Sequence, residues 1–152
     1  MRALRVITAF LASAAVTAAL GAAASTQFVL AALADLGATI PLGIRLAMTF
    51  DDIAGMGPLY AVIVAVAFLI AFLVAAWLVR WRASRRRATV YALAGAAAVL
   101  MTLLLMRATF DITAIAGTRT LAGVLVQGLM GAVGGYVFAR LSGSRGPARS
   151  PI

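Results

Sequence analysis

The chain has 152 residues, of which 64% are hydrophobic and 11% are charged, and its mean hydropathy is +1.09. Soluble domains are about half apolar and about a quarter charged, so this composition predicts an integral membrane protein. The sequence contains no His, Cys or Glu, which excludes disulfides, thiolate or histidine nucleophiles and the usual zinc and haem ligands. We therefore expect neither an enzyme nor a cofactor.

The net charge of +9 reflects thirteen basic residues, all of them Arg, and only four acids, all of them Asp. In a membrane protein, basic residues first mark the cytoplasmic side. We therefore expect no nucleic-acid partner. The partners that we expect are the lipid bilayer and anionic lipids at the cytoplasmic face, attracted by about 1 kcal/mol per arginine. The lysine-free, alanine-rich composition is typical of a GC-rich bacterial genome, which predicts a bacterial inner membrane.

The chain begins with a candidate spanning helix over about residues 6–25, preceded by Arg2 and Arg5. A basic start, an apolar stretch and small residues such as Ala22 and Ala24 also satisfy the pattern of a cleaved signal peptide. However, the apolar run is longer than a usual signal core, and the sequence stays hydrophobic after it. We therefore favour an uncleaved helix, although the sequence alone leaves cleavage open.

Residues 26–57 form the least regular segment, because they hold three of the four acids together with four glycines and a proline. A crossing by residues 28–48 would place the following arginine-rich loop on the outer side, which the positive-inside rule opposes. We therefore expect an extracytoplasmic segment that lies at the membrane surface or dips in as a re-entrant hairpin. Within it, residues 40–53 predict a short amphipathic helix capped by Thr39.

Three further apolar segments predict spanning helices, at about residues 59–79, 88–106 and 121–139. An arginine-rich loop over residues 80–87 connects the first two and should stay in the cytoplasm, and Trp77 beside it is typical of an anchor at a membrane surface. Residues 142–152 are rich in Gly, Ser and Pro and predict a disordered cytoplasmic tail. The sequence thus predicts a single transmembrane domain, residues 1–141, with the N-terminus and the C-terminus both cytoplasmic.

This topology separates the charges. Ten arginines fall on the cytoplasmic side with no acid among them, whereas three arginines and all four aspartates fall on the other side. Few alternative topologies sort the charges so completely. The fold class that we predict is an all-α integral membrane protein, a four-transmembrane-helix bundle with an extracytoplasmic interfacial or re-entrant segment.

The charged residues on the predicted outer side are the default candidates for a functional site, because desolvating them costs free energy unless they are paired or wet. They would form the mouth of an ion or proton pathway, or a polar surface for a partner. The alternative is that they lie among headgroups and water and only anchor helix ends. Arg45, Thr49 and Asp52 share one strip of the short helix. The predicted polar extracytoplasmic cluster comprises Asp35, Arg45, Asp51, Asp52, Arg107, Asp111 and Arg119.

The adjacent Asp51 and Asp52 raise the question of a divalent-cation site, since hard cations bind several carboxylate oxygens. Neighbouring side chains on a helix point about 100° apart, so a shared ion would need a loop or a third acid. We therefore predict no metal site.

A sharper pattern lies in the last span, where small residues and one Gln recur every four residues. Such a stripe lets two helix backbones approach closely, and the Gln can hydrogen-bond across the contact. The sequence leaves open whether the partner helix belongs to this chain or to another copy. Because the first span is also rich in small residues, we expect these two spans to face protein and residues 59–79 to face lipid. The predicted helix-packing stripe comprises Gly123, Gln127, Gly131 and Gly135.

The two outer segments resemble each other weakly. The tripeptide at residues 49–51 recurs at 109–111, and the one at 53–55 recurs at 115–117. A duplication would give parallel repeats related by an axis along the membrane normal. Short matches arise easily in a sequence of low diversity, so duplication remains an open hypothesis.

Two functions are compatible with these observations. The first is a non-enzymatic small membrane protein that acts by helix–helix association, as an accessory subunit of a larger membrane protein or as a homo-oligomer. The second is a small ion or proton channel or transporter with a charged extracytoplasmic mouth. A pathway usually needs polar groups along its length, and the spans offer little besides Gln127 and a few hydroxyls, which favours the first.

Overall fold

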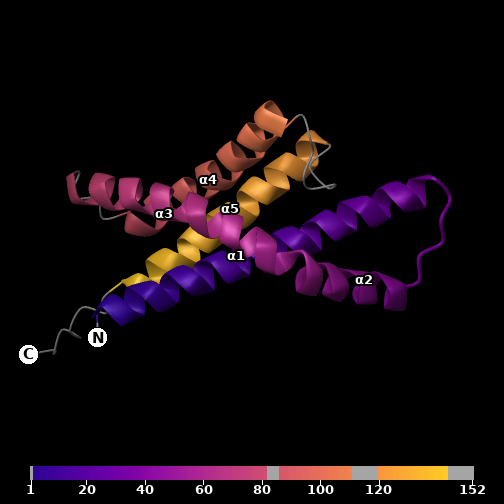
Figure 1. Cartoon of the computed structure of the whole chain (residues 1–152), viewed down its shortest axis with the longest axis horizontal. Helices are drawn as coiled ribbons and strands as arrows, with labels where there is room; N and C mark the ends of the chain where they lie inside the picture. Colours follow the sequence, from indigo (N-terminus) through magenta and orange to yellow (C-terminus); the bar gives the residue numbers. More distant parts are fainter. Residues whose placement is uncertain (1, 82–85, 111–119, 144–152) are drawn as a thin grey trace, which may run out of the picture.

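The computed structural model describes residues 2–81, 86–110 and 120–143, and within these ranges it is all-helical (Figure 1). Four of the helices, α1, α3, α4 and α5, are long and apolar enough to cross a membrane. The prediction of an all-α chain with four such segments is confirmed. The five helices of the described residues are α1 (Arg2–Asp35), α2 (Leu42–Gly55), α3 (Gly57–Trp81), α4 (Arg87–Phe110) and α5 (Leu121–Ser142).

Helix α1 is much longer than a membrane crossing requires. About 20 residues span a hydrocarbon layer of about 30 Å at about 1.5 Å per residue, and α1 has 34 residues. We expected this helix to end near residue 25, but neither Gly nor Pro occurs between residue 25 and Gly37. There the helix ends in a Schellman motif: Gly37, at φ 91°, donates its N–H to the Ala34 carbonyl, and Ala38 donates to the Leu33 carbonyl.

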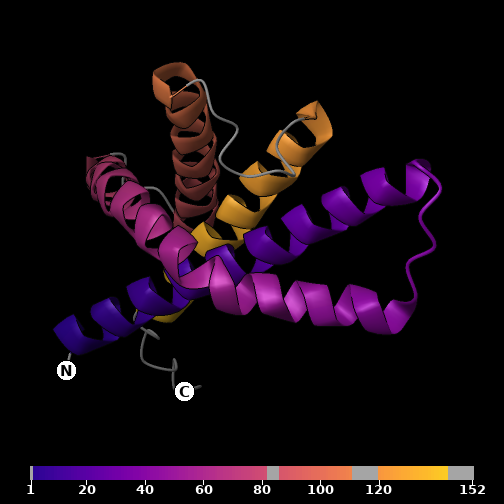
Figure 2. The same ribbon diagram turned by 45° about the vertical axis from the view of Figure 1, so that its right-hand side comes forward.

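The segment expected to be irregular is instead a helical hairpin. Helix α2 starts two residues later than predicted, with Pro41 rather than Thr39 at its N-cap and no side-chain cap. It runs back along the second half of α1, and the two together extend away from the other helices (Figures 1 and 2). No residue of α2 is buried. The hairpin is hereafter defined as residues 26–55.

Helices α2 and α3 are joined almost without a break. Met56 is the single residue between them, and its N–H donates to the Asp52 carbonyl while its own carbonyl accepts from Tyr60 N–H. Pro58 follows in the first turn of α3, where the ring removes no helical hydrogen bond. The backbone hydrogen bonds thus bridge the joint from one helix to the next.

Helix α5 lies at the centre of the bundle, between α4 and α1. Buried residues make up 39% of the most apolar windows of α1 and α5 but 22% of those of α3 and α4. This confirms the prediction that the first and last spans face protein. Helix α3 exposes large apolar side chains along its length, among them Leu69, Ile70 and Leu73.

Four aromatic rings tie α3, α4 and α5 together near the α3–α4 connection. The Phe72 ring stacks on Phe138 with centroids 4.5 Å apart and meets the edge of Tyr91 at 5.5 Å. Phe68, which is fully buried, lies one turn away from Phe72 at 4.6 Å. Such ring pairs stabilise a core by about 0.5–1.5 kcal/mol beyond the area that they bury.

The start of α1 and the end of α5 lie at the same end of the bundle as the end of α3 and the start of α4 (Figure 1). There, arginines from two other helices satisfy the C-terminus of α5: Arg5 donates to the carbonyls of Leu141 and Gly143, and Arg87 donates to the hydroxyl of Ser142. The last carbonyls of a helix lack helical partners and carry partial negative charge, so cations bind there favourably. Residues 82–85 of the predicted arginine-rich loop and 144–152 of the predicted tail lie outside the described residues.

Candidate functional site

A group of polar side chains joins the two helices of the hairpin where it meets the bundle. Thr26 Oγ1 is 2.6 Å from Asp52 Oδ2 and 3.0 Å from the Ala22 carbonyl oxygen, so its single proton has two competing acceptors. One residue further along α1, Gln27 Nε2 donates to Thr49 Oγ1 at 3.0 Å. Thr49 in turn donates to the Arg45 carbonyl at 2.7 Å. We call these five residues the hairpin cluster: Thr26, Gln27, Arg45, Thr49 and Asp52.

The hairpin cluster explains why a segment so rich in polar residues stays helical. Arg45, Thr49 and Asp52 share one strip of α2, as their spacing predicts, and the bonds made by Thr49 and Asp52 turn this strip towards α1. Arg45 is half-buried, and its Nε is the one buried side-chain polar atom without a hydrogen-bond partner in the described part of the chain. A buried donor without an acceptor costs about 1–3 kcal/mol.

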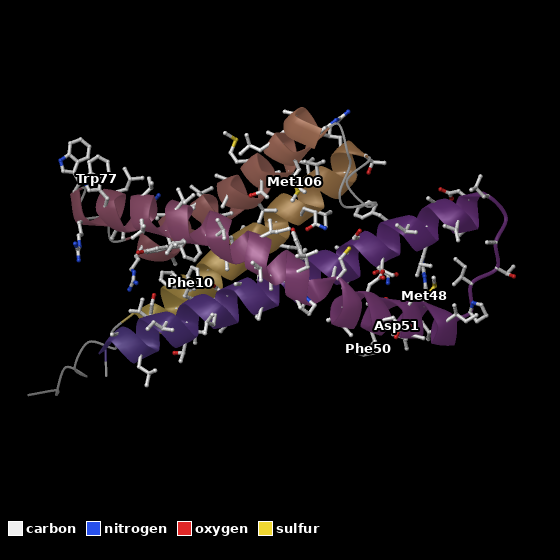
Figure 3. The ribbon with its side chains drawn as sticks, viewed as in Figure 1. Phe10, Met48, Phe50, Asp51, Trp77 and Met106 are labelled. Atoms are coloured by element: carbon white, nitrogen blue, oxygen red, sulfur yellow. The ribbon has the colours of Figure 1, made fainter. Side chains whose placement is uncertain are left out.

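The predicted polar extracytoplasmic cluster is not one site. Asp35 ends α1 and is exposed, and Asp51 points away from α1 together with Phe50 (Figure 3). Arg107 is exposed near the end of α4. No ion pair joins these residues to Arg45 or Asp52 within the described ranges. Asp111 and Arg119 lie outside the described residues, and so does most of the second copy of the repeated tripeptides.

Asp51 and Asp52 point to different sides of α2, one exposed and one against Thr26. Over residues 2–81, 86–110 and 120–143, no three acidic side chains come together in a way that could hold a metal ion.

A second group of polar side chains is buried between the helices of the bundle and connects three of them. Gln127 of α5, which is 2% exposed, donates from Nε2 to the Gly21 carbonyl of α1 at 2.8 Å. Its Oε1 accepts from the Tyr60 hydroxyl of α3 at 3.0 Å. Both polar atoms of this buried amide are thereby satisfied. Sequence analysis identified Gln127 but missed Tyr60, although both stand within two turns of the same end of their spans.

Hydroxyl groups continue this polar line along α1. Ser13 and Thr17 are both 0% exposed. Ser13 donates to the Phe10 carbonyl at 2.7 Å, and Thr17 donates to the Ser13 carbonyl at 2.9 Å. Thr17 Oγ1 also lies 3.5 Å from the Met130 carbonyl of α5. These hydroxyls bond mainly to their own helix, so they allow close helix packing without leaving polar atoms unpaired.

The four residues of the predicted packing stripe are all buried, but they do not all face the same neighbouring helix. Gln127 contacts α1 and α3, whereas a Cβ added at Gly131 would meet the Gly95 carbonyl oxygen of α4 at 2.5 Å. A Cβ at Gly135 would collide with the Tyr91 carbonyl oxygen, also in α4. Positions four residues apart advance 400° and so drift by about 40° around a helix. The helix that these glycines contact therefore belongs to the same chain.

Comparison of the chain with family models, with curated proteins and with solved structures finds no match. Its function has to be inferred from its own residues and their geometry.

Proposed function

We propose that the chain is a non-enzymatic, multi-pass protein of a bacterial inner membrane, with both termini in the cytoplasm. Four spanning-length helices support a multi-pass membrane protein. The orientation is supported by the end of the bundle that carries Arg5, Arg80, Arg87 and Arg140, because arginines near short loops are retained in the cytoplasm.

This placement puts the hairpin at the extracytoplasmic surface. About 20 residues cross the hydrocarbon layer, which is the distance from Arg87 to Arg107 on α4 and from Arg5 to the start of the hairpin cluster on α1. The cluster then lies at the outer boundary, where its polar groups meet water and headgroups. The hairpin continues beyond this boundary as a surface element, and it is a regular pair of helices rather than a re-entrant loop.

The function that we propose is association with a larger membrane protein, to which this chain is an accessory subunit through α2. One observation carries the proposal: none of the 14 residues of α2 is buried, while Leu42, Leu46 and Phe50 are 72%, 52% and 68% exposed. An exposed apolar helix face outside the hydrocarbon layer marks an interaction surface. The glycines that first suggested association between chains are already used inside the bundle.

The charges on the hairpin favour binding to a different protein over binding to a second copy of this chain. The exposed charged residues of the hairpin, Asp35 and Asp51, are both negative. A symmetric pairing of two hairpins would bring like charges together across the interface, which opposes association. A partner with basic residues around an apolar groove would instead complement both features of α2.

Replacing two exposed side chains of α2 is expected to release the partner. In the double variant Leu46→Ala/Phe50→Ala, each truncation removes about 1–3 kcal/mol of apolar contact, so affinity should fall by roughly tenfold or more. The matched control is Leu69→Ala/Leu73→Ala, which truncates two side chains of α3 that are 55% and 65% exposed. Native mass spectrometry of protein extracted in mild detergent from its own membrane reads out the bound chain.

We expect the wild type and the α3 control to carry a second polypeptide, and we expect the α2 variant to lose it. If the mass is instead a multiple of 15.6 kDa, the chain forms a homo-oligomer and is not an accessory subunit of another protein. If the α2 variant and its control retain a partner equally well, then α2 is not part of the interface.

A second candidate function, a small ion or proton channel or transporter, is favoured by the line of polar groups from Asp52 through Tyr60 and Gln127 to Thr17 and Ser13. In this proposal Asp52 receives the cation at the outer end. Against it, most of these groups are already satisfied by helix backbones, which is the arrangement expected for packing.

The channel candidate predicts that Asp52→Asn lowers cation or proton flux into liposomes at least fivefold, because the entry charge is lost. Asp51→Asn removes the same charge from the neighbouring position, which is exposed and faces away from α1, and it should leave flux unchanged. If both variants carry the wild-type flux, or if the wild type carries none, this candidate is wrong.

A further inference from the structure

An apolar cavity of about 150 Å³ lies between α3 and α4, in the half of the bundle nearer to the hairpin. The α3 side chains that line it recur at helical spacing on one face, and α4 closes the opposite side. Its principal lining residues are Met56, Tyr60, Ile63, Ala67, Leu103 and Met106.

The cavity arises from the way the two helices diverge. Near their connection they are held together by the contact of Phe72 with Tyr91. Towards the other end they separate, so that the start of α3 and the end of α4 lie far apart in both ribbon views (Figures 1 and 2). Small side chains such as Ala67 do not fill the space between them.

The lining offers a ligand no free hydrogen-bonding group. The Tyr60 hydroxyl is engaged by Gln127, and the hydroxyl of Thr102, which also lines the cavity, donates to the Ala98 carbonyl at 2.8 Å. Apolar cavities of this size stay dry and take up small apolar groups. A helix, about 10 Å across, is too wide to enter. A slender apolar chain fits this space.

A positive charge stands at the outer end of the same face. Arg107 lies four residues after Leu103, and hence one turn beyond it on the same side of α4. Arg107 is exposed, and no described residue forms a hydrogen bond or ion pair with it. A guanidinium binds phosphate oxygens through two parallel hydrogen bonds, so it complements a phosphate headgroup.

We infer that the cavity between α3 and α4 and the guanidinium of Arg107 together form a binding site for one phospholipid of the outer leaflet. A segment of its acyl chain fills the cavity, and its phosphate binds Arg107. The inference rests on the proposed placement of the bundle in a membrane, but not on the accessory role of α2.

The test is a titration of the protein in mild detergent with phosphatidylglycerol, followed by native mass spectrometry. Ala67→Phe fills the cavity, and Val66→Phe is its matched control, since Val66 is the neighbouring residue and is 59% exposed. Arg107→Gln removes the guanidinium, and Arg80→Gln removes one at the opposite end of the bundle. The wild type and both controls should bind one lipid with the same affinity, and both site variants should bind it at least tenfold more weakly.

Ala67→Leu, a smaller filling, supplies the same comparison if Ala67→Phe does not fold. Weakening by the cavity variants alone would mean that only the acyl chain is bound, and it would overturn the role of Arg107. Equal affinity in each variant and its control would overturn the whole inference. Alkaline extraction of membranes tests the membrane placement separately. If the chain resists extraction, it is embedded in the membrane even when the lipid site is wrong.

Discussion

A single methyl group added by Gly135→Ala is expected to break the contact between α4 and α5. The new Cβ would overlap the Tyr91 carbonyl oxygen and press on the backbone of Ala92 at 3.0 Å. Neither atom belongs to a side chain that can rotate away, so the helices must separate along the whole contact, which includes the mutual approach of Gly95 and Gly131. Overpacking of this kind costs about 3 kcal/mol or more, and SDS titration of the protein in mixed micelles measures it.

Gly43→Ala provides the matched control for this experiment. It makes the same chemical change inside a helix, but a Cβ at Gly43 meets nothing within 4 Å. Ala is the better helix former, so this variant should be as stable as the wild type or more stable by about 0.5–1 kcal/mol. If Gly135→Ala unfolds at the same SDS fraction as Gly43→Ala, then α4 and α5 do not pack as described.

The second large effect is expected at Gln127. Gln127→Leu keeps the size of the side chain but removes both hydrogen bonds, leaving the Gly21 carbonyl and the Tyr60 hydroxyl without their partner. We expect a loss of about 2 kcal/mol in the free energy of unfolding, because the buried Tyr60 hydroxyl then stays unsatisfied and the hydrogen bond between α5 and α1 is lost. Tyr60→Phe removes only one bond and should cost about 1 kcal/mol.

The double variant Gln127→Leu/Tyr60→Phe tests whether these losses share one cause. Once Gln127 is gone, removing the Tyr60 hydroxyl deletes an unsatisfied group, so the second substitution should cost almost nothing. The coupling from a double-mutant cycle should be about 1 kcal/mol, within the range measured for hydrogen bonds between membrane helices. Additive losses would mean that the two side chains do not interact in the membrane.

The spans were predictable because hydrophobic composition and length determine them with little help from tertiary contacts. The central position of α1 and α5 was also predictable, since small residues at helical spacing have few uses apart from close packing. What the pattern could not supply was the division of the stripe, in which Gln127 turns to α1 and α3 while Gly135 turns to α4. That division depends on where three other helices stand around α5.

The hairpin shows why the rest of the site escaped prediction. Its polar residues suggested irregular backbone, because each one by itself is unfavourable near hydrocarbon. Thr26 and Asp52 satisfy each other, as do Gln27 and Thr49, across separations of 26 and 22 residues. Such long-range pairs leave no periodic signal in either segment. The length of α1 was in principle predictable from the absence of Gly and Pro between Gly21 and Gly37, but the polarity of residues 26 and 27 obscured it.

Met56 belongs at once to the joint between α2 and α3 and to the wall of the cavity. Helix α2 is a rod of about 21 Å, given about 1.5 Å per residue, and backbone hydrogen bonds at this residue connect it to α3. Any ligand that holds α2 at a new tilt therefore displaces Met56 and reshapes the space for an acyl chain. Thermodynamic linkage then acts in both directions: the lipid must alter the affinity at α2 by the same factor by which occupancy of α2 alters the affinity for the lipid.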